Sequence, residues 1–167
     1  MGIELRALAV TDGIDIYEML QELPADENGY INRAAGMSFD EYKEWLKGKV
    51  QEAEQTGIID GWKVPSTTFW LFEDGRPVGC GNLRHFLTDK LLEQGGNIGY
   101  SIRPSDRNRG LGKTLLSLLI EESRKKGIDK LLLTIHSQNT PSLHVALANG
   151  GKIEKATEER SYVWIVL

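Results

Sequence analysis

The sequence predicts one α/β domain over residues 1–167, an α+β fold with a mixed antiparallel and parallel sheet and helices on both faces. A length of 167 residues fits one ordinary domain and leaves little room for a second hydrophobic core. Two β-branched and aromatic runs joined by Asp74-Gly75 predict an antiparallel hairpin. Between Asn97 and Ile135, a strand, a glycine-containing loop, a helix and a buried strand predict a βαβ unit, which supplies the parallel part.

Composition and charge exclude several classes of protein. Hydrophobic residues make up 40% of the chain and charged residues 26%, which argues against a disordered chain or a coiled coil. The formal charge of −4 argues against a general attraction to nucleic acid or to an anionic membrane, so neither is an expected partner. The first twenty residues do not resemble a signal peptide, and no run of about 18 apolar residues predicts a membrane span.

The cysteine and histidine content indicates a cytoplasmic protein without a metal site. Cys80 is the single cysteine, so no disulfide can form within the chain, and a reducing cytoplasm is the expected compartment. The histidines His85, His136 and His144 do not form a zinc-binding pattern with Cys80. We therefore expect no metal cofactor.

Hydrophobic periodicity places strands and helices along the whole chain. Thr11 or Asp12 is expected to cap the first helix, whose apolar positions recur at helical spacing. Ser38-Phe39-Asp40-Glu41 has the pattern of a capping box and opens the second helix, which should end before Gly57. The polar stretch Ala25–Met37 between them is expected to be a loop. The expected strands are Ile3–Ala9, Thr67–Phe72, Val78–Leu83, Asn97–Ile102, Leu131–Ile135, Lys152–Lys155 and Ser161–Val166.

A glycine loop before the third helix is the most informative local feature. The chain is acidic overall, yet residues 103–130 carry eight basic and four acidic side chains. Within this stretch Gly110 and Gly112 precede a helix that should end at Gly127, and the first N–H groups of any helix lack intrahelical partners. Glycines let an anion approach those N–H groups, which is typical of a pyrophosphate site.

Three alternative roles for this loop fit the sequence less well. Glycines can serve tight strand-to-helix packing alone, but the flanking Arg107, Arg109 and Lys113 favour an anion. Gly112-Lys113-Thr114 matches the end of a Walker A motif, although Arg107 stands where that motif requires a glycine. A dinucleotide fingerprint would need its third glycine at Leu115. A P-loop NTPase and a nicotinamide-binding fold are therefore disfavoured.

Two segments in the last 70 residues carry a family pattern. The first pattern is Arg or Gln, any two residues, Gly, any residue, and then Gly or Ala, and the chain matches it with Arg107-Asn108-Arg109-Gly110-Leu111-Gly112. The second pattern is Asn, any two residues, Ser, and then a helix that ends in Gly, and the chain matches it from Asn139 to Gly150. The chain thereby resembles the GNAT superfamily of acetyl-CoA-dependent N-acetyltransferases, which implies the GNAT acyl-CoA N-acyltransferase fold. Val64–Trp70, Arg84-His85 and Asn149–Gly151 are similar to a bacterial subgroup known mostly as predicted acetyltransferases.

The resemblance implies acetyl-CoA as the cosubstrate. Its pantetheine arm would enter between strands Asn97–Ile102 and Leu131–Ile135, where an exposed strand edge can pair with an extended amide-bearing arm. An N–H near Tyr100 would stabilise the thioester oxyanion, which makes Tyr100 a catalytic candidate. Asn139 would orient the arm or the adenine end, although the role of a helix cap suits it equally well. The residues expected to bind the cofactor are Tyr100, Ser101, Ile102, Arg107, Asn108, Arg109, Gly110, Leu111, Gly112, Lys113, Asn139 and Ser142.

The usual acid and base of the resembled family are missing from this sequence. Many members place a Glu base where this chain has Asn97, and a Tyr acid where it has Ala146. The substitute bases are His85, Glu93 and Glu73, each of which also suits an ordinary structural role, and His85 ranks first as a catalytic residue. Aromatic side chains that could line an acceptor pocket, or simply belong to the core, are Tyr30, Trp62 and Trp70.

The expected function is transfer of an acetyl group from acetyl-CoA to the primary amine of an unidentified small molecule or protein, by direct attack in a ternary complex. The alternative is a non-catalytic acyl-CoA-binding regulatory module, with which the departures at Asn97 and Ala146 are compatible. Turnover of acetyl-CoA in the presence of amines distinguishes the two. The oligomeric state stays open, with a homodimer as one alternative.

Overall fold

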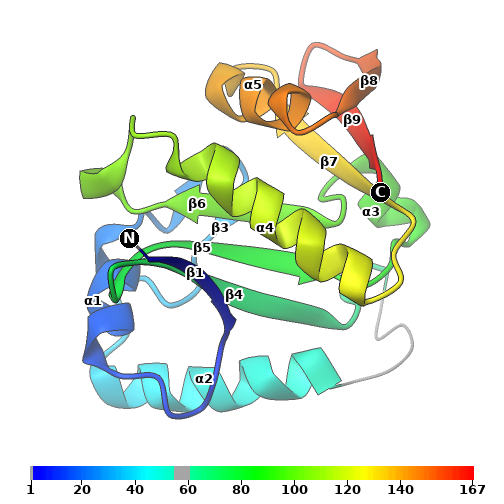
Figure 1. Ribbon diagram of the computed structural model, residues 1–167. Helices are drawn as coiled ribbons and strands as arrows, with labels where there is room; N and C mark the ends of the chain where they lie inside the picture. Colours follow the sequence, from blue (N-terminus) through cyan, green and yellow to red (C-terminus); the bar gives the residue numbers. More distant parts are fainter. Residues whose placement is uncertain (1, 55–60) are drawn as a thin grey trace.

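The computed structural model describes residues 2–54 and 61–167 and shows a sheet in two parts with helices on both faces (Figure 1). Gly57, before which the second helix is expected to end, lies outside these residues. The strands are β1 (Ile3–Ala7), β2 (Asp26–Glu27), β3 (Tyr30–Ile31), β4 (Ser66–Glu73), β5 (Arg76–Arg84), β6 (Ile98–Ile102), β7 (Lys130–His136), β8 (Lys152–Ala156) and β9 (Arg160–Val166). The helices are α1 (Ile14–Glu22), α2 (Phe39–Glu54), α3 (Asp89–Glu93), α4 (Leu111–Lys125) and α5 (Thr140–Ala148), with a 3-10 turn at Pro104–Asp106.

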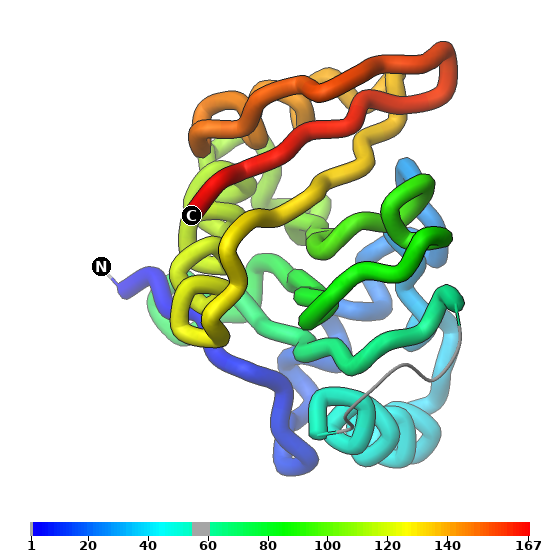
Figure 2. Tube along the Cα trace, turned by 90° about the vertical axis from the view of Figure 1, so that its right-hand side faces the viewer, coloured from blue at the N-terminus to red at the C-terminus, as the bar shows by residue number. Residues whose placement is uncertain are grey.

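The two parts of the sheet meet at a single point. One part has the order β1-β4-β5-β6 and the other β7-β9-β8, and every pair within them is antiparallel. Strands β6 and β7 run in the same direction (Figure 1), and the Asn97 N–H donates to Leu132 O at 2.8 Å just before β6 begins. Figure 2 shows β7, β9 and β8, in yellow, red and orange, lying apart from the green strands. The expected mixed sheet is confirmed. Its parallel part is limited to this contact between Asn97 and Leu132, which is called the join below.

Asn97 holds the join with its side chain as well as its backbone. Its Oδ1 accepts from Leu132 N–H at 2.8 Å, and its Nδ2 donates to Arg84 O at 3.2 Å. Asn97 is only 3% exposed, so these bonds replace contacts that water would otherwise supply. Gly96 precedes it with φ 63°, and a Cβ there would lie 2.4 Å from Leu132 O. The join therefore requires both this asparagine and this glycine.

The helices cover opposite faces of the sheet. α4 packs on one face, where a Cβ on Gly81 of β5 would lie 2.7 Å from a methyl carbon of Leu119. α5 lies on the same side, against β7, β9 and α4. α1 and α2 pack on the other face around the buried Trp70 and Tyr42. The expected helices on both faces are thus confirmed.

The predicted cap of α1 is wrong. The N-cap is Gly13, which makes no side-chain capping bond, rather than Thr11 or Asp12. The Asp12 carboxylate instead accepts from Trp70 Nε1 at 2.7 Å and forms an ion pair with Arg6. A buried indole N–H needs an acceptor, and that requirement takes the aspartate away from the helix.

The predicted loop between α1 and α2 contains a hairpin. β2 and β3 pair through Asp26 with Ile31 and Glu27 with Tyr30. Asn28 and Gly29 form the turn with φ 53° and 86°, the conformation that an Asn-Gly turn favours. The loop prediction for this segment is wrong, although the Asn-Gly pair is itself a hairpin signal. The hairpin contacts β6 close to the join and so takes part in the site described below.

Local signals elsewhere are confirmed. Ser38 and Glu41 form the reciprocal capping box at the start of α2, with bonds of 2.8 and 3.1 Å. Asp74 and Gly75 make the β4–β5 turn with φ 51° and 81°. The closing strands pair as β8 and β9, and Asn149 ends α5.

Replacing Asn97 with leucine tests the join. The change leaves the buried Leu132 N–H and Arg84 C=O without their side-chain partners, and each such loss costs about 1–3 kcal/mol. We expect Asn97→Leu to lower the free energy of unfolding in urea by about 2–4 kcal/mol. Gln138→Leu, at an exposed position, is the control and should change it by less than about 0.5 kcal/mol. Equal stability of the two variants would contradict the structural role of Asn97.

Candidate active site

The outer edge of β6 turns backbone groups toward the gap between β6 and β7. Bonds from Arg84 N–H to Asn97 O and from Arg103 N–H to Val78 O, both 2.7 Å, flank the β5–β6 ladder. Antiparallel pairing alternates, so the N–H groups of Ile98, Tyr100 and Ile102 face away from β5. The Tyr100 N–H therefore faces the gap. The Ser101 backbone faces β5 instead, which leaves it poorly placed to pair with a ligand.

The loop before α4 presents backbone N–H groups without partners. Asn108 and Gly110 have φ 65° and 79°, and Gly110 caps α4 without a side-chain bond. Within the described chain, no acceptor lies on the backbone N–H groups of Asn108 to Lys113. They border a cavity of about 400 Å³, lined also by Tyr100, Ile102 and Val145. The anion site that the sequence predicts would thus be built mainly from backbone.

The arginine side chains of this loop are engaged by carboxylates. Arg107 forms a two-pronged ion pair with Glu27 of the hairpin, with one N–O distance of 2.9 Å, and lowers the pKa of that carboxyl. Its Nε also donates to Ile102 O at 2.9 Å. Arg109 turns to Glu73 at 2.6 and 2.8 Å and does not line the cavity. Arg107 therefore ties the hairpin to the loop, and Arg109 offers only its backbone to an anion.

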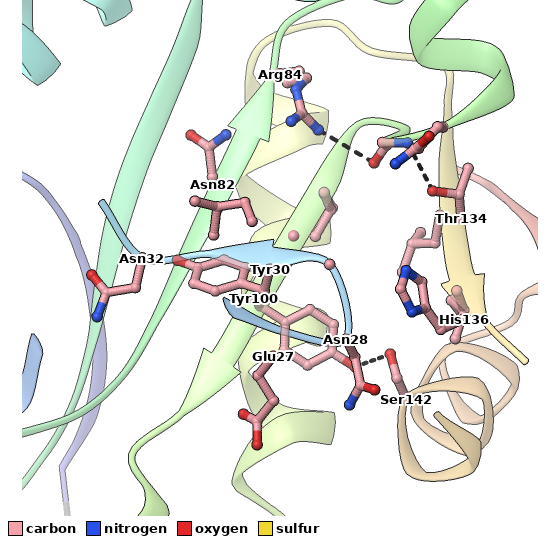
Figure 3. A pocket seen from close by; sticks show the side chains of 18 of the residues that line it. Glu27, Asn28, Tyr30, Asn32, Asn82, Arg84, Tyr100, Thr134, His136 and Ser142 are labelled. Carbon is pink, nitrogen blue, oxygen red and sulfur yellow. Dashed lines mark hydrogen bonds between the residues drawn. The ribbon is translucent and has the colours of Figure 1, made fainter. Parts of the chain in front are cut away.

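A second cavity of about 520 Å³ lies on the other side of β6 and β7. Its walls include the aromatic side chains named from the sequence, Tyr30, Trp62 and Trp70. Five residues line both cavities, so the two meet there: Glu27, Asn28, Tyr100, Asn139 and Ser142. Figure 3 shows Tyr100 and Ser142 turned toward one another at this junction.

Tyr100 offers a hydroxyl at the junction, a feature that the sequence alone does not reveal. The oxygen lies 3.2 Å from Ser142 Oγ, and burial raises the pKa of Tyr100. The Ser142 N–H donates to Asn139 Oδ1 at 3.4 Å, so Asn139 caps α5 and also lines both cavities. Ala146, where the resembled family carries a tyrosine, is fully buried. The hydroxyl at the junction therefore comes from β6 rather than from α5.

None of the three candidate bases named from the sequence lines either of these two cavities. His85 does not line either cavity, and its Nε2 lies 2.8 Å from Thr67 Oγ1. Glu73 binds Arg109, and Glu93 lines neither cavity. His136, at the end of β7, lines the larger cavity beside Gly29, and its ring has no hydrogen-bond partner in the described part of the chain. The chain order gives no signal for His136, because its position depends on how the hairpin meets β7.

Two negative findings apply to residues 2–54 and 61–167. No group of three His, Cys, Asp or Glu side chains there could hold a metal ion. None of the helices there has the length and apolar character needed to cross a membrane.

Known proteins share this fold. A GNAT-family acetyltransferase from Streptococcus pneumoniae has 17% identity and a TM-score of 0.68, with 99% of each chain covered. The putative acetyltransferase yncA from Salmonella typhimurium, solved with acetyl-CoA, has 17% identity and a TM-score of 0.62, with 100% of this chain and 95% of that chain covered. The spermidine/spermine N-acetyltransferase SpeG from Vibrio cholerae, in mutant form, has 15% identity and a TM-score of 0.64, with 99% and 95% covered.

A search of the curated proteins finds no match to the chain. The family model of the acetyltransferase (GNAT) family matches residues 32–150, which include α2, the glycine loop and α5. This segment is well over half of the sequence. The chain therefore belongs to the acetyltransferase (GNAT) family.

Proposed function

We propose that the protein transfers an acetyl group from acetyl-CoA to a primary amine by direct attack in a ternary complex. The observation that carries the proposal is the meeting of two cavities at Tyr100. One cavity ends at unpartnered backbone N–H groups that suit a pyrophosphate. The other is lined by aromatic side chains and is large enough for a small acceptor.

Acetyl-CoA would lie along the smaller cavity. Its pyrophosphate takes the backbone N–H groups from Arg109 to Lys113, and its pantetheine arm lies along the open edge of β6. The thioester oxygen then accepts from the Tyr100 N–H, which polarises the carbonyl for attack. The solved structure of yncA with acetyl-CoA, which shares this fold, supports a nucleotide-thioester ligand.

The amine attacks from the larger cavity and must be neutral to do so. His136 lies in that cavity with its ring unpartnered in the described chain, so it can take a proton from the amine directly or through water. Attack forms the C–N bond, and collapse of the tetrahedral intermediate breaks the C–S bond. The leaving thiolate has an ordinary pKa of about 8.5 and needs only modest help. The Tyr100 hydroxyl, held beside Ser142, can donate that proton.

A glycine substitution tests the cofactor placement. A Cβ on Gly112 would enter the smaller cavity and meet protein atoms no closer than 3.7 Å, so the protein itself should tolerate it. We expect Gly112→Ala to weaken acetyl-CoA binding in calorimetry by about tenfold, and Gly112→Val by more, because each side chain occupies space that the ligand needs. Gly48→Ala in α2, where a Cβ meets nothing, is the control. Unchanged affinity in folded Gly112→Val would refute the placement.

The two histidines give a matched test of the base. His136→Gln should lower kcat/KM at pH 7 by about tenfold or more, since proton removal from the amine is lost. The loss should shrink as the pH approaches the pKa of the amine, because the amine then deprotonates in solution. His85→Gln should change kcat/KM by less than about twofold, because His85 lies outside both cavities. The reverse pattern would restore His85 as the base.

The pH profile tests the Tyr100 hydroxyl. Burial raises its pKa above the ordinary value of about 10, so the protonated, donating form persists to higher pH. The rate should therefore rise as the amine deprotonates and show no fall near pH 10 while the protein stays folded. Tyr100→Phe should lower kcat by about tenfold and leave acetyl-CoA affinity unchanged. A variant with full kcat would show that solvent protonates the thiolate.

Turnover separates the proposal from the alternative of a binding module. Release of free thiol from acetyl-CoA in the presence of primary amines supports the enzyme. Tight acetyl-CoA binding without turnover across a broad amine panel would instead favour the non-catalytic module.

A further inference from the structure

Arg84 places an uncompensated charge in the wall of the larger cavity. Its Nη1 donates to the carbonyl oxygens of Gly95 at 3.2 Å and Gly96 at 3.0 Å. In the described part of the chain no carboxylate forms an ion pair with it, and its Nε and Nη2 have no partner. Burial lowers the pKa of Arg84, and no nearby carboxylate opposes that effect. A partly buried guanidinium in this state favours an anionic ligand.

The loop that holds Arg84 is fixed before any ligand arrives. Gly95 and Gly96 have φ 114° and 63°, which turn their carbonyl oxygens toward the guanidinium. The Gly95 N–H donates to Thr134 Oγ1 of β7 at 2.9 Å. The guanidinium is therefore held in one position beside the join between β6 and β7. A rigid cation of this kind binds a carboxylate with little ordering cost.

Basic side chains outnumber acidic ones in the wall of this cavity. Among its described lining residues Glu27 is the one acidic side chain, and Arg107 neutralises it. The basic lining residues are Arg33, Lys49, Arg84 and Arg160. Arg33 is exposed to solvent, and Lys49 and Arg160 each form an ion pair with a neighbouring glutamate. Arg84 is partly buried and forms no ion pair with a carboxylate in the described residues. In a chain of net charge −4 this cavity attracts anions and disfavours polycations.

Asn82 adds an acceptor for an N–H group. Its Oδ1 is the one buried side-chain oxygen or nitrogen in the described residues with no hydrogen-bond partner. Asn82 stands two positions before Arg84 on β5, so both side chains lie on one face, about 7 Å apart along the strand. Asn82 pairs with Gly99, the residue before Tyr100, and the ring of Tyr30 lies against Gly99 in the place that a side chain there would occupy. An amine bound at Asn82 would thus lie in the cavity that Tyr30 and Tyr100 also line, one strand away from the Tyr100 N–H.

We propose that the acceptor is a small amine that carries a carboxylate, of the amino-acid class, with its carboxylate on Arg84 and its amine beside Asn82. The proposal rests on the acetyl-transfer function proposed above and names its substrate class. The short distance between the two groups suits an amine and a carboxylate separated by a few bonds. A polyamine lacks the anion that Arg84 requires.

The first experiment compares matched substrates with the wild-type protein. Thiol release from acetyl-CoA is measured with each of the twenty amino acids, with the carboxamide of each, with spermidine and with O-phosphoethanolamine. The carboxamides have less basic amines, so more of each is neutral at a given pH, and any advantage of the amino acid must come from its carboxylate. We expect at least one amino acid to exceed its carboxamide by about tenfold or more in kcat/KM.

The second experiment removes the guanidinium. Arg84→Gln should lower kcat/KM for the preferred amino acid by about 10- to 100-fold, mostly by raising KM. The kcat/KM for the carboxamide of that amino acid and the affinity for acetyl-CoA should stay unchanged. Arg124→Gln, an exposed arginine of α4, is the matched control. If Arg84→Gln does not fold, Arg84→Lys keeps the charge and loses the forked geometry, and the substrate comparison stands without any variant.

The outcomes distinguish a failure of this substrate proposal from a failure of the proposed acetyl-transfer function. Faster acetylation of spermidine, the carboxamides or O-phosphoethanolamine would overturn the carboxylate class while leaving acetyl transfer intact. If no amine is acetylated, calorimetry measures whether each of the twenty amino acids binds to the CoA-bound protein. Binding that Arg84→Gln abolishes would support the carboxylate site although the proposed function has failed, and absence of any binding would overturn the site.

Discussion

The structure depends on the hydrogen bonds of Asn97, which hold three strands at one point. Backbone and side chain together bind Arg84 of β5 and Leu132 of β7, and beyond this point β6 and β7 separate. If β6 and β7 were paired along their length, the N–H groups of β6 that now face the gap would be hydrogen-bonded to β7. A carboxylate at this position could accept from Leu132 but could not donate to Arg84. An asparagine therefore suits this position of the join better than an acidic residue would.

The same join links the two ends of the proposed reaction. Tyr100 follows Asn97 closely along the chain, and its N–H lies between the backbone amides of the α4 loop and the acceptor cavity. Arg107 and Glu27 connect the α4 loop to the β2–β3 hairpin, and the hairpin in turn covers the junction. A charge pair that links segments 80 residues apart thus closes the site on one side. The side chain of Arg84 marks the other end of the cavity.

The sequence predicts the features that depend on neighbouring residues, but not the contacts between residues that lie far apart along the chain. The Asp74-Gly75 turn, the Ser38 capping box and the glycine loop follow from neighbouring residues, because turn and cap chemistry is local. The GNAT fold follows from the resemblance of the loop and α5. The roles of His136, Arg84 and the Glu27 ion pair cannot be predicted from the sequence, because each depends on which strands meet at the join. The sequence ranks His85 first among the candidate bases, but its side chain lies against Thr67 outside both cavities.

A crystal structure of the protein with acetyl-CoA tests the central claim most directly. We predict the pyrophosphate on the backbone N–H groups between Arg109 and Lys113, the pantetheine arm along the free edge of β6, and the thioester oxygen on the Tyr100 N–H. We also predict that Asn97 and Leu132 keep their bonds in the complex. A cofactor bound elsewhere, or strands β6 and β7 paired along their length, would contradict this mechanism.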